Sequence, residues 1–158
     1  MILRPVVHDT FALEREYPAA PRQVFVAFAD LATKQRWFAG PEGWVARDEH
    51  TLDFRVGGRE HEAGGPPEGP THSFDAVYHD IVPDARIIYS YTLSLDDRPI
   101  SVSLTTIEIF PRGEGSRLRL TEHGAYFDDM PPPLRREGTG ELLDALGRVL
   151  AESVGDGA

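Results

Sequence analysis

The chain has no cysteine, so it can form neither disulfide bonds nor thiolate sites for metal binding or redox chemistry. Basic residues are also scarce: 16 lysines and arginines stand against 26 aspartates and glutamates, which gives a formal net charge of −10. This balance disfavours nucleic-acid and anionic-membrane partners, because both need a basic patch. No segment approaches the roughly 20 apolar residues of a membrane-spanning helix, and residues 1–16 become charged too quickly for a signal peptide. We therefore expect a cytoplasmic protein with no nucleic-acid or membrane partner.

Sequence motifs for metal, nucleotide or nucleophilic sites are missing as well. There is no HExxH motif or histidine pair at ligand spacing, and strand alternation turns His61 away from its neighbours Glu60 and Glu62. The Gly57-Gly58 pair lacks the G-x-G-x-x-G pattern and does not open a helix, so it predicts a bend. No G-x-S-x-G elbow occurs. We expect no metal site and no cofactor, and no catalytic residue can be assigned.

The pattern of apolar residues predicts a single domain over residues 1–158, with its core at about 10–153. The chain is 41% hydrophobic, which is ordinary for a soluble domain of this length. A strand at 10–17 precedes two short helices, the first opened by Pro21 and the second spanning 31–38. About six antiparallel strands follow within 44–123, joined by short turns, and 124–133 reads as a loop.

The last segment, residues 134–153, has an apolar stripe at helical spacing and predicts one long helix. The stripe consists of Leu134, Leu142, Leu143, Leu146, Val149 and Leu150. A curved sheet must cover one of its faces, and this helix is the only element large enough to do so. The predicted fold class is therefore α+β, with a curved antiparallel sheet wrapped around one C-terminal helix. Such an arrangement leaves a cavity between helix and sheet.

Several segments, read in order, resemble the Activator of Hsp90 ATPase homologue 1-like family within the START/Bet v1-like (SRPBCC) superfamily of helix-grip proteins. They are AAPRQVFVAFADLATKQRWF, DFRVGG, YHDIVPDARIIYSY, SVSLTTIEIFPRGEGSRLRLTEHGAYF and REGTGELLDALGRVL. The resemblance covers about Phe11 to Leu150, is strongest to bacterial single-domain, polyketide-cyclase-like proteins, and implies the helix-grip fold. Many members carry Gly-Trp near the start of the last helix, where this chain has Gly138-Thr139. That departure removes one bulky aromatic residue.

Glu122 stands out in the predicted strand at 116–123. It shares a strand face with Leu118 and Leu120, which belong against the core. One interpretation is a strand-end residue that reaches solvent or pairs with an arginine. The other is a polar anchor inside the cavity, with a raised pKa, because ligand pockets are mostly apolar with a few placed polar groups. The hydroxyls of Tyr89 and Tyr91 are its expected hydrogen-bond partners.

Aromatic residues on the predicted strands and loops supply the other candidate ligand contacts. Buried aromatics are commonly plain core, but two tyrosines on one inner strand face suit a cavity with polar spots. The candidate ligand-binding residues are Trp37, Phe38, Phe54, Phe74, Tyr78, Tyr89, Tyr91, Glu122 and Phe127. The loops at 64–70 and 128–133 are candidate movable rims.

These observations favour binding of a small hydrophobic molecule in the internal cavity. A protein-interaction or cochaperone-like module is the first alternative, since a net charge of −10 suits a basic partner surface. A cyclase or hydrolase that uses Glu122 is the second, although no companion catalytic group is apparent. The expected partners are a small apolar ligand and, as an option, a second copy of the chain in a homodimer.

Overall fold

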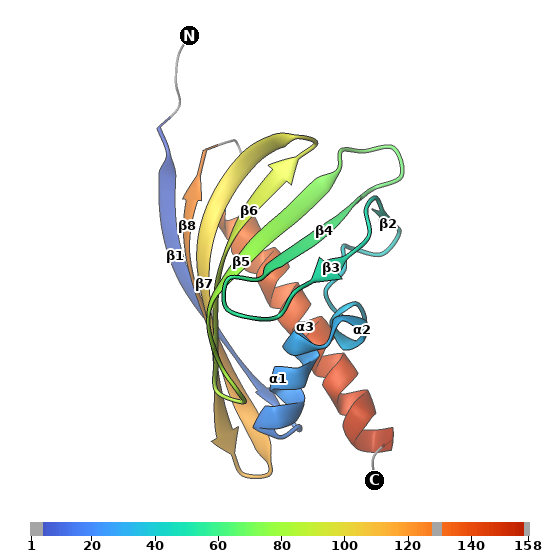
Figure 1. Cartoon of the computed structure of the whole chain (residues 1–158), viewed down its shortest axis with the longest axis vertical. Helices are drawn as coiled ribbons and strands as arrows, with labels where there is room; N and C mark the ends of the chain where they lie inside the picture. Colours follow the sequence, from blue (N-terminus) through green and yellow to red (C-terminus); the bar gives the residue numbers. More distant parts are fainter. Residues whose placement is uncertain (1–4, 128–130, 157–158) are drawn as a thin grey trace.

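A curved antiparallel sheet and one long helix make up most of the molecule (Figure 1). The computed structural model describes residues 5–127 and 131–156. The sheet has eight strands in the order β1-β8-β7-β6-β5-β4-β2, and β3 also pairs with β4. The strands are β1 (Val7–Tyr17), β2 (Val45–Ala46), β3 (Thr51–Leu52), β4 (Arg59–Gly65), β5 (His72–Val82), β6 (Arg86–Leu95), β7 (Arg98–Arg112) and β8 (Gly115–Tyr126).

The three helices lie on the concave side of the sheet (Figure 1). Helix α1 (Pro21–Ala29) starts at a proline, and α2 (Leu31–Lys34) starts behind Asp30, whose carboxylate accepts a 3.0 Å hydrogen bond from the Thr33 amide. Helix α3 (Pro132–Asp156) has 25 residues, so it is about 37 Å long and crosses the concave face. This arrangement confirms the predicted fold class.

Tight turns join the four long strands from β5 to β8. Two of the turns place an aspartate at positive φ, Asp84 at 64° and Asp96 at 52°, and the third places Gly113 there at 58°. Aspartate tolerates the left-handed region better than most residues because its short side chain can hydrogen-bond locally, and glycine has no Cβ to clash. The hairpins thus fix the register that sends alternate side chains of each strand to the concave face.

The core lies between this face and α3. On β8 the side chains of Leu118, Leu120 and Glu122 all point inward and are buried, whereas His123 is exposed. Across from them Leu146 is fully buried, and the buried apolar side chains around it on α3 are Leu143, Val149 and Leu150.

Helix α3 is tied to β1 at the edge of the sheet. The Tyr17 hydroxyl donates a 2.8 Å hydrogen bond to the Leu143 carbonyl, and Arg15 pairs with Asp144 at 2.7 Å. Among the residues that the structure describes, no helix is both long and apolar enough to cross a membrane.

Several predicted elements differ from the structure, and the second helix, predicted over 31–38, spans only Leu31–Lys34. Residues 124–126 are not loop but continue β8, since they pair with β1 on one side and β7 on the other. The first strands of the predicted 44–123 stretch, β2 and β3, have only two residues each, because only those residues pair with β4. Leu134 belongs to the helix but is 55% exposed, since it lies before the part of α3 that packs on the core.

Truncation of the buried helix stripe should destabilise the domain strongly. We expect Leu146→Ala to lower the free energy of unfolding by about 2–5 kcal/mol, because a fully buried leucine leaves a cavity that the core cannot close. Leu134→Ala on the same helix is the matched control, and its effect should stay within about 0.5 kcal/mol because that side chain is largely exposed. Urea denaturation measures both values, and equal effects would contradict the assignment of the core face.

Candidate ligand-binding pocket

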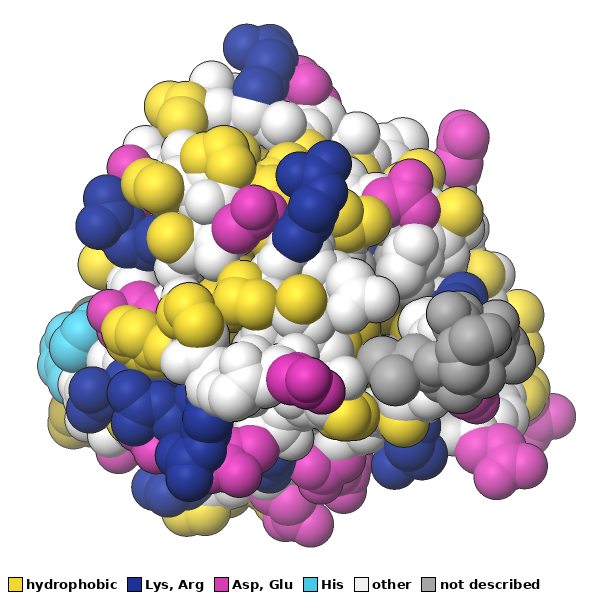
Figure 2. Space-filling view, turned by 90° about the horizontal axis from the view of Figure 1, so that it is seen from below, with side chains coloured by type: hydrophobic (Ala, Val, Ile, Leu, Met, Phe, Trp, Pro, Cys, Tyr) yellow, Lys and Arg dark blue, Asp and Glu magenta, His cyan; other side chains and the backbone are white. Residues whose placement is uncertain are grey.

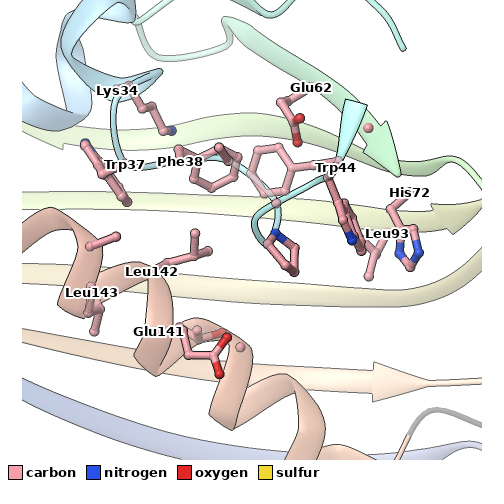
Figure 3. Close-up of a pocket in the computed structure, with 18 of the residues that line it drawn as sticks. Lys34, Trp37, Phe38, Trp44, Glu62, His72, Leu93, Glu141, Leu142 and Leu143 are labelled. Carbon is pink, nitrogen blue, oxygen red and sulfur yellow. The ribbon is translucent and has the colours of Figure 1, made fainter. Parts of the chain in front are cut away.

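A pocket of about 780 Å³ lies between the concave face of the sheet and α3. Its third wall is the segment from Lys34 to Trp44, which runs from the end of α2 toward β2 (Figure 3). The lining is mainly aromatic and aliphatic, with Trp37, Phe38, Trp44, Phe74, Tyr89, Tyr91, Leu93, Leu120, Leu134, Leu142 and Leu143 among its residues. The order of elements predicted a cavity between helix and sheet, and the helix indeed leaves part of that space unfilled.

Thr139 and its neighbour Gly138 line the helix side of the pocket. A Cβ atom added at Gly138 would meet no other atom within 4 Å, so this stretch of α3 faces open space. The Gly138-Thr139 position is therefore a pocket wall in this chain.

The structure brings six of the nine predicted site residues together at the pocket wall: Trp37, Phe38, Phe74, Tyr89, Tyr91 and Glu122. The other three lie elsewhere. Phe54 and Tyr78 pack edge to face, with ring centroids 5.0 Å apart, and belong to the core cluster. Phe127 follows β8 and is 42% exposed.

Glu122 is buried at the pocket wall and is held by hydroxyl groups. The Thr105 hydroxyl donates to its Oε1 at 2.9 Å, and the Tyr91 hydroxyl lies 3.1 and 3.2 Å from its two oxygens. Burial raises the pKa of Glu122, although these hydrogen bonds and the charge of Arg135 oppose the rise. The expected Tyr91 contact and the raised pKa are both present. The second donor is Thr105 from β7 rather than Tyr89.

Arg135, near the start of α3, lies against the same cluster. Its guanidinium donates to Ser101 at 2.7 Å, to Tyr91 at 3.0 Å and to Ser103 at 3.4 Å. These contacts join the helix to Tyr91 on β6 and to the two inward-facing serine hydroxyls on β7. An arginine engaged in this way positions α3 on the sheet and supplies the positive charge nearest to Glu122.

A second polar cluster lies where α2 meets β4, and no sequence pattern predicted it. The Lys34 ammonium and the Glu60 carboxylate form an ion pair at 2.6 Å, with side chains 3% and 0% exposed. His50 contacts the other Glu60 oxygen at 2.7 Å, and the Tyr78 hydroxyl donates to Glu60 at 2.6 Å. Burial works against ionisation of Glu60, but Lys34, His50 and Tyr78 together outweigh it and lower its pKa.

Glu62 lies two residues further along β4, and its surroundings differ from those of Glu60. It lines the pocket, and Figure 3 shows its carboxylate pointing from β4 into the cavity. Within residues 5–127 and 131–156, no side chain lies within hydrogen-bonding or ion-pairing distance of that carboxylate. Burial raises the pKa of Glu62, against the weaker pull of His50 and Lys34. His61, between the two glutamates, faces outward as predicted and contacts Asp48 and Asp75.

The pocket rim differs from the one expected at 64–70 and 128–133. Gly64 lines the pocket, but it belongs to β4, whose last residue is Gly65. Residues 128–130 of the second predicted rim lie outside the described residues. The Gly40–Trp44 stretch forms part of the rim instead, and sequence reasoning missed it because a short glycine-proline segment looks like any surface loop.

The curved sheet, the single crossing helix and the pocket between them define a helix-grip protein with an internal cavity. The sequence profile of the Activator of Hsp90 ATPase homolog 1-like proteins (AHSA1) matches residues 18–151, and the chain belongs to this family.

Solved structures from several organisms share the fold over nearly the whole chain. The Mll3558 protein from Rhizobium loti is 46% identical, has a TM-score of 0.84 and aligns over 93% of this chain and 100% of its own. An uncharacterized protein from Rhizobium leguminosarum is 37% identical, with a TM-score of 0.89 over 96% of this chain and 99% of its own. The AHSA1 protein from Silicibacter pomeroyi is 28% identical, with a TM-score of 0.76 over 92% and 99%. Among curated proteins none matches this chain. These likenesses establish family and fold, and a shared fold does not by itself assign a function.

Breaking the buried ion pair should cost more than losing an exposed one. We expect Lys34→Met to lower the free energy of unfolding by about 3–5 kcal/mol, because it leaves the Glu60 carboxylate buried without its main counter-charge. Adding Glu60→Gln to that variant should restore part of the loss, since no charge is then stranded. Arg36→Met is the control, because its pair with Glu152 is 50% and 63% exposed and contributes about 0–1 kcal/mol. A loss below 1 kcal/mol for Lys34→Met in urea melts would contradict the burial of the pair.

The raised pKa of Glu122 should appear in the pH dependence of stability. Above the ordinary pKa of 4.5, the native state holds the Glu122 proton where the unfolded chain has released it, so this group lowers the free energy of unfolding as pH rises. Glu122→Gln removes the titration and keeps an acceptor for Thr105 and Tyr91. The variant should therefore gain stability relative to the natural chain as the pH rises above about 4.5. Urea melts at several pH values test this, with Glu14→Gln on the exposed sheet face as control, and a pH-independent difference would refute it.

Proposed function

We propose that this protein binds a small, mostly apolar molecule in the pocket between its sheet and α3. The observation that carries the proposal is the pocket itself, about 780 Å³ with largely aromatic and aliphatic walls. That volume falls within the range of roughly 300–1,000 Å³ of small-molecule sites, which combine an apolar lining with a few polar groups. A ligand that replaces water against these walls gains the free energy of apolar burial.

The polar groups at the walls support binding better than catalysis. Glu122, the residue on which an enzymatic function would depend, is engaged by Tyr91 and Thr105, and its neighbour Arg135 is engaged by Tyr91 and two serines. A general acid or base needs a position beside its reacting atom and a proton that it can exchange. Here the same groups hold the helix to the sheet, so they act first as structure.

A protein-docking function has weaker support. The face shown in Figure 2 carries several hydrophobic patches, but lysine, arginine, aspartate and glutamate side chains interrupt them. Protein interfaces have an apolar centre that is depleted in charge. We therefore place the functional surface inside the pocket.

Filling the pocket from the helix side tests the proposal. We expect Thr139→Trp to weaken binding of the neutral hydrophobic dye N-phenyl-1-naphthylamine at least tenfold, because the indole would occupy the volume beside Gly138. Glu137→Trp, at an exposed position of α3 outside the pocket lining, is the matched control and should bind like the natural chain.

Dye fluorescence titrations give the affinities, and circular dichroism verifies that both variants are folded. Native mass spectrometry of freshly purified protein adds a search for a co-purifying small molecule. Equal dye binding by the Thr139→Trp variant and the natural chain would place the apolar site elsewhere and overturn the proposal.

A further inference from the structure

Among the pocket-lining carboxylates that no described side chain contacts, Glu62 is the one that is partly buried, and this bears on the ligand. On β4, Glu60 and Glu62 share a strand face, but their surroundings differ. Glu60 has contacts on both of its oxygens, from Lys34, Tyr78 and His50. Glu62 has none of these, lines the pocket and points into it (Figure 3). A ligand in the pocket could therefore supply the hydrogen-bond donor or positive charge that Glu62 lacks.

The positive charges around the pocket are largely committed to other groups. Lys34 pairs with Glu60, and Arg36 pairs with Glu152, and neither of these two carboxylates lines the pocket. Arg135 lies beside Glu122 and donates to Tyr91 and two serines.

Of the four lining carboxylates, Glu122 lies beside Arg135, and the other three, Glu42, Glu62 and Glu141, have no ion pair among the described residues. Of the lining cations, Arg148 has none either. The charge left at the walls is thus predominantly negative, which favours a cationic group and disfavours an anionic one.

Aromatic rings flank Glu62. Phe74 is its direct partner across the β4–β5 pair, so the two side chains are neighbours on the concave face. The Phe74 ring centroid lies 4.9 Å from that of Phe38. Trp44 packs on His72, which is two residue pairs further along the β4–β5 ladder. A carboxylate beside several aromatic faces is a suitable environment for an ammonium group, which gains a charge-assisted hydrogen bond and cation–π attraction.

We propose that the ligand is a cationic amphiphile, an amine on an apolar body, and that Glu62 binds its ammonium group. This inference rests on the proposed function, since it places the amine in the same pocket. The apolar body would lie against the aromatic and leucine walls, and the ammonium would donate to the Glu62 carboxylate between the rings.

Three probes with one skeleton separate charge from shape: 4-phenylbutylamine, 4-phenylbutan-1-ol and 4-phenylbutanoate. Isothermal titration calorimetry at pH 7.5 should show the amine binding at least tenfold more tightly than the alcohol. The 4-phenylbutanoate probe should bind most weakly. Glu62→Gln should bring the amine and the alcohol to within about twofold of each other, because Gln keeps the shape and removes the charge. Glu68→Gln, which removes an exposed carboxylate outside the pocket lining, is the control and should keep the preference.

The outcomes distinguish this inference from the function on which it rests. Equal affinity of the natural chain for amine and alcohol, both lost in the Thr139→Trp variant, would leave the apolar pocket in place and overturn the role of Glu62. Tightest binding of the carboxylate would overturn it as well. If none of the three probes nor the neutral dye bound, the proposed function itself would fail. Since the comparison of probes on the natural chain needs no variant, the inference stays testable even if Glu62→Gln does not fold.

Discussion

One helix has to cover the concave face of a sheet that is much wider than itself. With strands about 4.8 Å apart, the sheet from β1 to β2 is about 30 Å across, whereas a helix with its side chains is about 10–12 Å wide. Helix α3 packs beside β1, where Tyr17 and Arg15 bind it. It cannot also cover β4 and β5. The segment from Lys34 to Trp44 covers part of the remaining width, and the pocket occupies what neither element fills.

Two polar clusters hold this incomplete covering in place, and each joins a helix to the sheet. Arg135 fastens α3 through hydroxyl groups on β6 and β7, and Lys34 fastens the end of α2 to β4 through Glu60. Buried charges are costly unless they are paired and hydrogen-bonded. Lys34 and Glu60 meet both conditions, and Arg135 and Glu122 lie beside each other and both hydrogen-bond to the Tyr91 hydroxyl. Directional contacts of this kind specify where the helices lie across a cavity that apolar packing alone would tend to close.

Strand alternation and helical spacing were sufficient to predict the fold, because both record which face of an element is buried. They also placed Glu122 on the inner face and Tyr91 within its reach. They could not predict the Lys34–Glu60 pair, because 26 residues separate its members and no local pattern marks a lysine as buried. Glu62 was overlooked for a similar reason: the sequence shows that Glu60 and Glu62 share a face but not that three side chains converge on only one of them. Thr139 was noticed as a departure from the family pattern, and only the structure shows that it faces the pocket.

The attachment of α3 to β1 has a consequence for the order of folding. Arg15 and Asp144 are 129 residues apart, and Tyr17 meets Leu143 across 126. The chain must therefore close a long loop before these contacts form, which slows folding. During synthesis every strand leaves the ribosome before α3 does, so the nascent sheet has an uncovered apolar face until the last helix emerges. That interval is when the chain is most prone to aggregate and when a chaperone would have the largest surface to bind.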